Sequence, residues 1–374
     1  MSTVDVLVVG AGQAGLGTAY RLQRLGVRDV LVLEAGEVGQ SWLDRWESLQ
    51  LFTPRRFSRL PGLRFPRGTT VSPSRAEMAG YLQDYARRWA LPVRTGTPVL
   101  RLTRAGDRFA AETPSGEVRA RQVVVASGAF RRPYLPAAAR DLAVPQLHSA
   151  DYRRPDDVPP GRVLVVGGGN SAAQLAVELS ATHEVTVASA QEPRYLPARV
   201  LGVSIFDWLL VSGVLNADRD RPLTRRARAR GDAIVGRELD RLRRRGVLRV
   251  LPHRVVAADG TRVGLSDGSD LEVAGVLWCT GFAPDTAWVD VPGALHDDGA
   301  PRHDRGASPV PGLHWMGLPW QTRLNSGLVD GVDRDARRTA ARVHRALSAP
   351  AGRQGGWLPP ETWTRPSSPS RSPR

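Results

Sequence analysis

The chain contains no lysine, so all 52 of its basic residues are arginine. Against 37 acidic residues they give a formal net charge of +15, which invites comparison with nucleic-acid-binding proteins. The arginines are dispersed, however, apart from residues 225–230 and 241–245, which read as solvated helix faces. No basic stretch of the sequence alternates with aromatic residues, as a base-stacking platform requires. The charge therefore indicates arginine-rich codon usage, and we expect no nucleic-acid partner.

Cysteine is almost absent as well, since Cys279 is the only one. A single cysteine excludes an internal disulfide and also the paired redox cysteines of disulfide reductases. Long apolar runs are missing too, because none approaches the roughly 20 residues of a membrane span. An apolar strand begins almost at the first residue, which leaves no signal peptide. We therefore expect a cytoplasmic protein without a membrane span.

A glycine-rich turn near the start is what the sequence does contain. The apolar run Val4–Val9 leads into Gly10, Gly12 and Gly15, spaced as G-x-G-x-x-G. The first glycine permits the turn, the second removes a Cβ that would hit a pyrophosphate, and the third lets the next helix pack on the strand. A second strand then delivers Glu34 about twenty residues further on, where a carboxylate binds ribose hydroxyls. These features predict a βαβ dinucleotide-binding unit.

A second turn of the same kind follows the apolar strand 163–166. Gly167, Gly169 and Ala172 occupy its three positions, and alanine is small enough for the third. Two such turns predict two nucleotide cofactors held face to face, with electron transfer between them. The fold class that follows is α/β, with two Rossmann-like dinucleotide-binding domains.

The cofactor of the second unit is predicted from the residues after strand 185–188. No acidic residue ends this strand, which favours NADPH, because a carboxylate would repel its 2′-phosphate. Ser189 can hydrogen-bond a phosphate or a ribose hydroxyl, and Arg194 can reach back with a bidentate contact. We expect a modest preference for NADPH, with NADH left open.

Turn residues and composition suggest where the domains divide. The first nucleotide domain is predicted to span residues 1–154 and 281–349, because a late strand and a helix at 333–347 return to it. The second, at 155–280, follows a proline cluster and contains the arginine-rich helices as an insertion. From residue 350 onward Pro, Ser, Gly and Arg dominate, a composition typical of disorder.

Several short motifs stand in a specific order along residues 4 to 347. They are Gly10-Ala-Gly-Gln-Ala-Gly15, Val38-Gly-Gln-Ser-Trp42, Trp46-Glu-Ser-Leu-Gln-Leu-Phe-Thr-Pro54, Ala126-Ser-Gly128, His148-Ser-Ala-Asp-Tyr152, Gly167-Gly-Gly-Asn-Ser-Ala172, Cys279-Thr-Gly-Phe282 and Gly317-Leu-Pro-Trp-Gln321. With this set the chain resembles the class B flavin-dependent monooxygenases, a group that includes the flavin-containing monooxygenases and the plant auxin-forming monooxygenases. Ala190 departs from the family pattern, which usually has an arginine there.

The resemblance implies FAD on the first unit and a nicotinamide cofactor on the second. It also implies which positions contact the two cofactors. They are Gly10, Gly12, Gln13, Ala14, Gly15, Glu34, Ala35, Ser41, Trp42, Val99, Ser127, Gly128, His148, Gly167, Gly169, Asn170, Ser171, Ala172, Ser189, Arg194, Cys279, Thr280, Gly281, Leu318 and Ser326. For His148 a second interpretation stays open, that of a linker histidine hydrogen-bonded to backbone.

In the reaction that the resemblance implies, NAD(P)H reduces FAD, dioxygen adds at flavin C4a, and the (hydro)peroxide oxygenates a small organic substrate. Thr53, Gln321 and Asn325 are candidates, by position, for hydrogen-bonding this oxygen adduct. Nitrogen or sulfur oxygenation and Baeyer–Villiger insertion are both compatible with the sequence. Two rival classes also stay open: a flavin reductase or dehydrogenase without oxygen insertion, and a non-catalytic flavin-binding regulator. The sequence makes no prediction of the oligomeric state.

Overall fold

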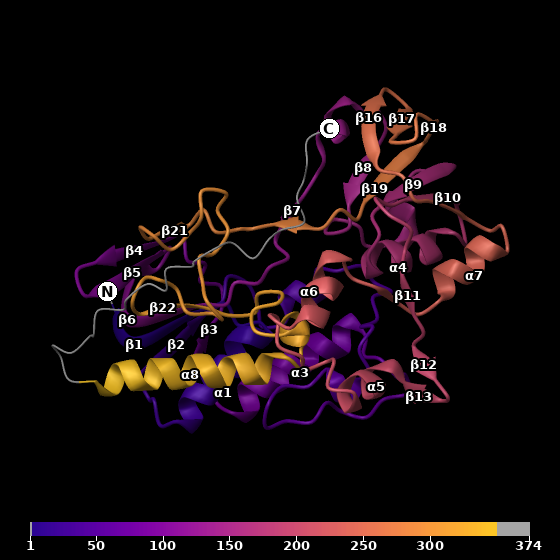
Figure 1. Cartoon of the computed structure of the whole chain (residues 1–374). Helices are drawn as coiled ribbons and strands as arrows, with labels where there is room; N and C mark the ends of the chain where they lie inside the picture. The colour runs from indigo at the N-terminus through magenta and orange to yellow at the C-terminus, as the bar shows by residue number, and fades with distance from the viewer. Residues whose placement is uncertain (1, 350–374) are drawn as a thin grey trace.

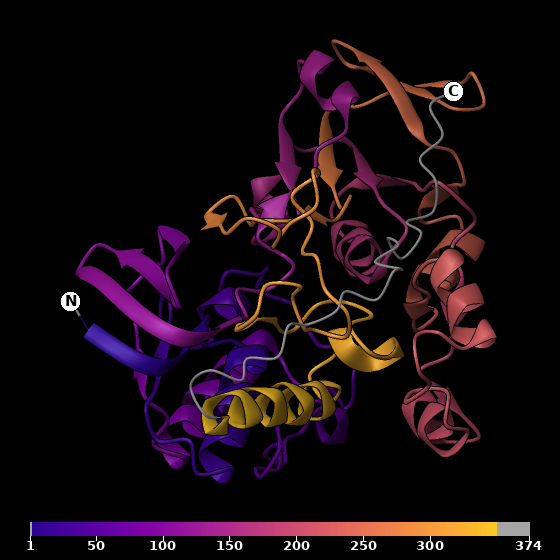
Figure 2. The ribbon, with the colours of Figure 1, turned by 60° about the vertical axis from the view of Figure 1, so that its left-hand side comes forward.

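Two separate β-sheets organise the chain, and each carries helices on one of its faces (Figure 1). The structure is a computed structural model that describes residues 2–349. The tail predicted to be disordered, 350–374, lies outside the described residues. Figure 2 shows the two sheets as distinct bodies, with the second sheet above the first.

The first sheet has the strand order β21-β4-β5-β6-β1-β2-β3, and β22 also pairs with β6. Its centre is parallel, while β4, β5 and β6 form an antiparallel meander. The strands are β1 (Ser2–Val9), β2 (Val30–Leu33), β3 (Val93–Arg94), β4 (Arg101–Ala105), β5 (Arg108–Thr113), β6 (Gly116–Val125), β21 (Val289–Asp290) and β22 (Leu313–Trp315).

The second half of strand β1, residues 6–9, is apolar because both of its faces are covered. Val6 and Val8 pack with helices α1 (Gln13–Arg24), α3 (Arg75–Arg88) and α8 (Val332–Ser348). Leu7 and Val9 point the other way, into a core shared with the meander. This period-two alternation explains why the predicted strand reads as a continuous run rather than an alternating pattern.

Helix α8 returns the end of the described chain to the first sheet, where it lies along α1 (Figure 1). The two helices approach closely at Gly17, where a Cβ would lie 2.8 Å from a methyl group of Val332. An ion pair between Arg21 and Asp333 joins them on the outside. The predicted return of the chain near residue 333 therefore takes the form of a helix–helix contact.

The second sheet has the order β15-β10-β9-β19-β8, and all of its pairs are parallel. Helices α4 (Asn170–Leu179) and α7 (Glu238–Arg244) cover one face, and the antiparallel sheet β16-β17-β18 (Val255–Asp259, Arg262–Leu265, Asp270–Glu272) covers the other. Strand β8 lies in this sheet, ahead of the boundary predicted at residue 155. The strands are β8 (Gln146–His148), β9 (Arg162–Val166), β10 (Glu184–Ala188), β15 (Arg249–Leu251) and β19 (Gly275–Trp278).

The chain crosses between the sheets twice, and the crossings pair as β7 (Arg132–Pro133) and β20 (Phe282–Ala283). An insertion between β10 and α7 contains the predicted arginine-rich helix at 225–230. Its elements are β11 (Tyr195–Leu196), β12 (Arg199–Val200), β13 (Val203–Ser204), α5 (Ile205–Val211), α6 (Pro222–Ala229) and β14 (Ile234–Val235). Shorter elements elsewhere are α2 (Gln40–Leu43) and 3₁₀ turns at Arg55–Phe57, Ala137–Asp141, Pro155–Asp157 and Leu324–Gly327.

Within residues 2–349, no helix combines the length and the apolar character that crossing a membrane requires.

One buried histidine makes the stability of the first sheet depend on pH. His314 of β22 is buried, its Nε2 lies 3.1 Å from the side-chain oxygen of Gln122, and its Nδ1 has no partner among the described residues. Burial, aided by the charge of Arg342, lowers the pKa of His314 from 6.5 to about 4. The unfolded chain therefore binds a proton between these two pH values that the folded chain does not, and acid favours unfolding.

We expect the free energy of unfolding to be fully retained above pH 6.5, the ordinary pKa, and to fall as pH drops toward 4. The loss due to His314 is up to about 1.4 kcal/mol per pH unit. Urea unfolding of the wild type and of His314→Gln, at about pH 7 and about pH 5, measures it. A variant that lost as much stability as the wild type over this range would contradict the assignment.

Candidate functional site

The central strands of the first sheet end in register at one edge. Val9 pairs with Leu33 and Val125, and Val125 pairs with Trp315. In open α/β sheets the carboxyl ends of the strands form the ligand-binding edge. The segments that leave this edge carry the predicted residues Gly10, Glu34, Ala35, Ser127, Gly128 and Leu318.

The three glycines of the first turn serve different purposes. Gly10 has φ +104°, and a Cβ there would lie 2.5 Å from the carbonyl oxygen of Ala126. A Cβ on Gly15 would lie 1.8 Å from the carbonyl oxygen of Gly10. These two glycines are therefore required by the packing of the protein itself.

Gly12 is different, because a Cβ there would meet nothing within 4 Å and its φ is −74°. It is also the N-cap of α1, and no side chain caps the helix. The first N–H groups of the helix are thus without a side-chain cap and are open to an external acceptor, with free space beside Gly12. This arrangement fits a dinucleotide pyrophosphate. Gln13 and Ala14 follow in the first turn of the helix.

Glu34 lies directly beside this turn. Its carboxylate accepts hydrogen bonds from the N–H of Ala11 at 2.6 Å and from the N–H of Gly36 at 3.2 Å. Backbone hydrogen bonds join residues 34–36 to residues 94–97. Val99 follows two residues after this paired segment. Ser41 and Trp42 lie nearby in the chain on α2, and Trp42 packs against the cores of both domains.

Leu318 reaches the first turn through Gly317. This glycine has φ +80°, and a Cβ on it would lie 2.7 Å from the Cβ of Ala14. The segment after β22 is therefore pressed against the start of α1, as the predicted cofactor contact of Leu318 requires.

An acidic residue that the sequence analysis missed shapes the loop at 321–326. The buried Asp335 of α8 accepts a hydrogen bond from the hydroxyl of Thr322, and burial raises the pKa of this carboxyl. Ser326 Oγ accepts from the N–H groups of Thr322 and Arg323, each at 3.0 Å. The Ser326 hydroxyl therefore orders the loop. An acidic residue within the apolar stripe of α8 was the available signal.

The three candidates for contacting oxygen differ in how their side chains are used. The buried Thr53 hydroxyl lies 2.8 Å from that of Ser58. The Gln321 side chain turns back on its own loop, with Oε1 accepting from the N–H of Leu318 at 3.3 Å. Asn325 is buried too, yet its Oδ1 has no hydrogen-bond partner among residues 2–349. Of the three, only Asn325 presents an unsatisfied polar atom.

The second turn repeats the plan of the first. Gly167 has φ +152°, and a Cβ there would lie 2.4 Å from the carbonyl oxygen of Cys279. A Cβ on Gly169 would meet nothing within 4 Å, and this residue is the uncapped N-cap of α4. Ser171 follows in the first turn, and Ala172 is buried as the third position requires. The second turn fits a pyrophosphate for the same reasons.

Asn170, Ser189 and Arg194 are predicted to contact the nicotinamide cofactor, and their side chains also bond within the protein. Asn170 accepts from the N–H of Val235 at 2.9 Å, which ties the insertion to the start of α4. The Ser189 hydroxyl donates to the carbonyl of Gln191 at 2.6 Å. The Arg194 guanidinium donates to the carbonyls of Arg230 and Gly231, both at 3.3 Å. Their roles toward a 2′-phosphate stay predictions.

His148 ends strand β8, and both of its ring nitrogens bond to backbone. Nδ1 accepts from the N–H of Ala150 at 3.1 Å, so Nε2 carries the proton and donates to the carbonyl of Gly281 at 3.1 Å. Burial lowers the pKa of this imidazole below its ordinary value. These contacts match the backbone-bonded alternative for His148. Thr280, beside Gly281, donates its hydroxyl to the carbonyl of Tyr134.

Cys279 contributes its backbone rather than its thiol. Its carbonyl faces Gly167, and burial raises the pKa of the thiol to about 12. A thiol with this pKa stays protonated at neutral pH and is a poor nucleophile.

Two arginines between the domains were not predicted, because no spacing pattern marks them. The Arg45 guanidinium lies 5.1 Å from the ring centroid of Phe282, next to the paired crossings. Arg219 of the insertion donates to the carbonyl of Gln321 at 3.0 Å and to the carboxylate of Asp304 at 2.8 Å. Arg219 thus attaches the insertion to the loop that carries Asn325.

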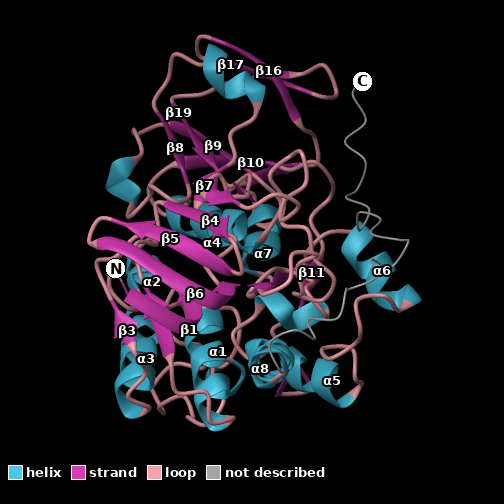
Figure 3. Cartoon of the chain, turned by 90° about the vertical axis from the view of Figure 1, so that its left-hand side faces the viewer, coloured by secondary structure: helices cyan, strands magenta, loops and turns pink. Residues whose placement is uncertain are grey.

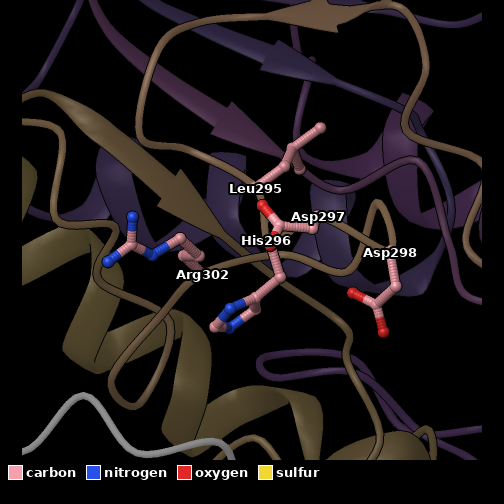
Figure 4. A pocket seen from close by; sticks show the side chains of 5 residues that line it. All are labelled: Leu295, His296, Asp297, Asp298 and Arg302. Carbon is pink, nitrogen blue, oxygen red and sulfur yellow. The ribbon is translucent and has the colours of Figure 1, made fainter.

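A cavity of about 430 Å³ is lined by residues of the chain segment that connects β21 to β22, and its lining includes no residue predicted to bind a cofactor (Figure 4). The side chains around it are Leu295, His296, Asp297, Asp298 and Arg302.

Comparisons with known proteins agree with this geometry. The family description "Pyridine nucleotide-disulphide oxidoreductase" matches residues 7–199. An uncharacterised CzcO-like oxidoreductase of Geobacillus kaustophilus is 39% identical over 335 residues, which cover 89% of this chain and 96% of that protein. The solved structure of a flavin-containing monooxygenase from Stenotrophomonas maltophilia has a TM-score of 0.76 at 31% identity, covering 93% of this chain and all of that one. The chain belongs to the pyridine nucleotide-disulphide oxidoreductase family and, within it, to the flavin monooxygenases.

A more distant relative is the rice indole-3-pyruvate monooxygenase YUCCA8, which is 26% identical over 385 residues. The alignment covers 90% of this chain and 90% of that protein. The family resemblance, the α/β class with two Rossmann-like domains, and FAD and NADPH as cofactors are thereby confirmed. The assignment of each cofactor to one turn stays a prediction.

Replacing Gly12 with valine should remove FAD and leave the fold intact, because the new side chain meets open space rather than protein. Flavin absorbance per mole of purified protein measures the loss. Gly80→Val is the matched control, since a Cβ at this helical glycine also meets nothing within 4 Å. A Gly12→Val protein with a full complement of FAD would refute the assignment of this turn.

Gly169→Val should leave FAD bound but slow the reduction of the flavin by NADPH, because only the second pyrophosphate site is blocked. Stopped-flow absorbance under anaerobic conditions gives the reduction rate, and dithionite reduction confirms that the flavin itself is intact. If FAD were lost together with NADPH reduction, the division into two sites would be wrong.

Proposed function

We propose that this chain consumes NADPH, holds FAD at the Gly12 turn, and inserts one atom of dioxygen into a small organic substrate. The observation that carries the proposal is the lone cysteine. A redox-active internal disulfide needs two cysteines, whereas this chain has one, and burial raises the pKa of its thiol to about 12. Electrons that reach the flavin therefore go to another acceptor, for which we propose dioxygen.

The two turns have complementary roles in the proposal. Gly10, Gly12 and Gly15 with Glu34 would hold the FAD, and Gly167, Gly169 and Ala172 would hold the nicotinamide cofactor. Bound FAD supplies the hydride acceptor and the centre at which dioxygen is activated. The protein would orient the two cofactors relative to each other. Both pyrophosphates would bind at helix N-termini that close backbone packing holds in place.

We assign the contact with the oxygenating centre or the substrate to Asn325. An unsatisfied buried amide oxygen costs about 1–3 kcal/mol, and a donor from a bound molecule would recover this energy. The loop is held in advance by Asp335, Thr322 and Ser326, so Asn325 needs little rearrangement to act. Gln321 and Thr53, whose side chains bond within the protein, would serve to shape the site.

Apolar packing next to Asn325 would keep water out. Phe206 and Leu215 of the insertion are buried against Phe57, with Phe52 and Leu324 packed around them. Water exclusion matters for an oxygenase, because water allows reduced oxygen to escape as hydrogen peroxide. The insertion therefore has a proposed role in coupling NADPH oxidation to oxygen transfer.

The proposal is tested by mixing the reduced protein with oxygen in a stopped-flow spectrophotometer. We expect a transient species, distinct from both reduced and oxidised flavin, before reoxidation. Labelled dioxygen should then place one oxygen atom in a substrate, and a thioether compared with a cyclic ketone separates heteroatom oxygenation from Baeyer–Villiger insertion. Single-phase reoxidation with stoichiometric hydrogen peroxide and no labelled product would instead identify a flavin reductase.

Asn325→Ala should leave anaerobic flavin reduction by NADPH within about twofold of the wild type. It should raise the share of NADPH electrons that end as hydrogen peroxide, with a loss of product formation of about tenfold or more, the scale of one oriented hydrogen-bond contact. Asn216→Ala is the control, because Asn216 lies 3.5 Å from Asn325 Nδ2 and does not reach the unsatisfied oxygen. Equal peroxide yields in wild type and Asn325→Ala would remove Asn325 from the active centre.

A further inference from the structure

The insertion exposes apolar side chains that the fold does not cover. Leu201 is 88% exposed and Val211 is 83% exposed, the two largest values for big apolar residues in the described chain. Their neighbours in the insertion are exposed to a lesser degree. We call the following set the insertion surface: Val200, Leu201, Val203, Trp208, Leu210 and Val211.

Leu201 stands at the tip of a hairpin in an unfavourable backbone conformation. Strands β12 and β13 pair on either side of it, its φ is +50°, and Gly202 follows with φ +76°. Tight hairpin turns of this kind prefer Asn-Gly or Asp-Gly, since other residues are strained at positive φ. In water, a leucine here is both strained and fully solvated. A partner that buries this side chain would account for its presence.

The hairpin and helix α5 form one continuous surface. The indole N–H of Trp208 donates to the carbonyl of Val200 at 3.2 Å, which fixes the tryptophan against the hairpin. Val211 lies three residues further on the same helix face. Phe206, on the side of α5 away from Trp208, is buried, and Asp207 pairs with Arg56 of the first domain. These contacts fix α5 on the body of the protein, while the insertion surface stays exposed to solvent.

Arginines accompany this surface without neutralising partners. Among residues 2–349, no carboxylate forms an ion pair with the exposed arginines 199, 221, 225, 226 and 230. Three aspartates of the insertion are already paired, Asp218 and Asp220 with Arg305 and Asp207 with Arg56. Helices α5 and α6 lie along the same edge of the molecule (Figure 3). The partner of the insertion surface should therefore carry negative charge.

We propose that the insertion surface docks on an anionic lipid bilayer. Leu201, Val211 and Trp208 would enter the interface between headgroups and acyl chains, and the arginines would contact the phosphates. Tryptophan suits this depth because its ring is apolar and its N–H is polar. The protein would bind peripherally, which is compatible with the absence of a spanning helix among the described residues.

Other occupants fit these charges less well. A second copy of the chain would bring like-charged arginines together across a symmetric contact. The segment 350–374 contains four arginines and a single acidic residue, so it too is repelled. A nucleic acid would satisfy the arginines, yet it offers no aliphatic interior for Leu201 and Val211.

The proposed docking surface would also bring the active centre close to the bilayer. The buried face of α5 packs against Phe57 and Leu324, which neighbour Thr53 and Asn325 in the chain. The docking proposal is based only on the exposed residues of the insertion, and it does not depend on the proposed oxygenase activity.

The test is co-sedimentation of the full-length flavoprotein with vesicles of phosphatidylcholine alone or mixed with phosphatidylglycerol. We expect binding only to the anionic vesicles, weakened by added salt. Leu201→Asn combined with Val211→Gln should reduce binding by at least about tenfold. The melting temperature should not fall, because asparagine tolerates positive φ better than leucine. Arg225→Gln with Arg226→Gln should weaken binding and its dependence on salt.

Leu100→Gln is the matched control, because Leu100 is a 58% exposed leucine outside the insertion, and it should bind vesicles like the wild type. Three results would overturn the proposal. One is no binding to anionic vesicles, and another is binding that the insertion variants leave unchanged. The third is that sedimentation velocity shows a dimer or a nucleic-acid complex, that Leu201→Asn disrupts this species, and that the variant still binds vesicles.

Discussion

Close backbone contact between a glycine turn and a neighbouring strand end is the constraint on which both halves of this structure depend. A Cβ at Gly10 would lie 2.5 Å from the carbonyl of Ala126, and one at Gly167 would lie 2.4 Å from the carbonyl of Cys279. Because no side chain fits there, the chain can turn at once into a helix whose N-terminus faces the edge of the sheet. The open space beside Gly12 and Gly169 follows from this turn. The same local solution, used twice, creates two places for a pyrophosphate.

The family to which the chain belongs is named for disulfide chemistry, and this chain lacks the means for it. Its one cysteine, partly buried, lies beside the second glycine turn, and burial of the thiol raises its pKa to about 12. Our proposal places the oxygen chemistry instead in the loop after β22. There Asp335 and Ser326 hold the backbone, and Asn325 keeps an unsatisfied oxygen. A change of electron acceptor thus needs no change of fold, since the cofactor turns stay the same.

The insertion between β10 and α7 joins the two nucleotide domains into one working unit. Arg219 bonds to the Gln321 carbonyl, Arg305 pairs with Asp218, and Phe206 packs beside Phe57. One face of the insertion thereby closes the region around Asn325, while the other exposes Leu201 and Val211. The proposed role in water exclusion rests on the buried Phe206 and Leu215, and the proposed role in lipid docking rests on the exposed β12–β13 hairpin and Val211.

The amino-acid sequence by itself determined the features that depend on local chemistry. The spacing of Gly10, Gly12 and Gly15, and its repeat at Gly167, predicts both βαβ units, because backbone sterics and strand periodicity act within a few residues. Tertiary structure alone decided what depends on residues far apart in the chain. It bonded both His148 nitrogens to backbone and placed Asp335 under the 321–326 loop. It also directed Arg194 toward the end of α6. Such pairings are set by packing between distant segments, so the sequence marks at most one partner, as it does with the acidic Asp335 in the apolar stripe of α8.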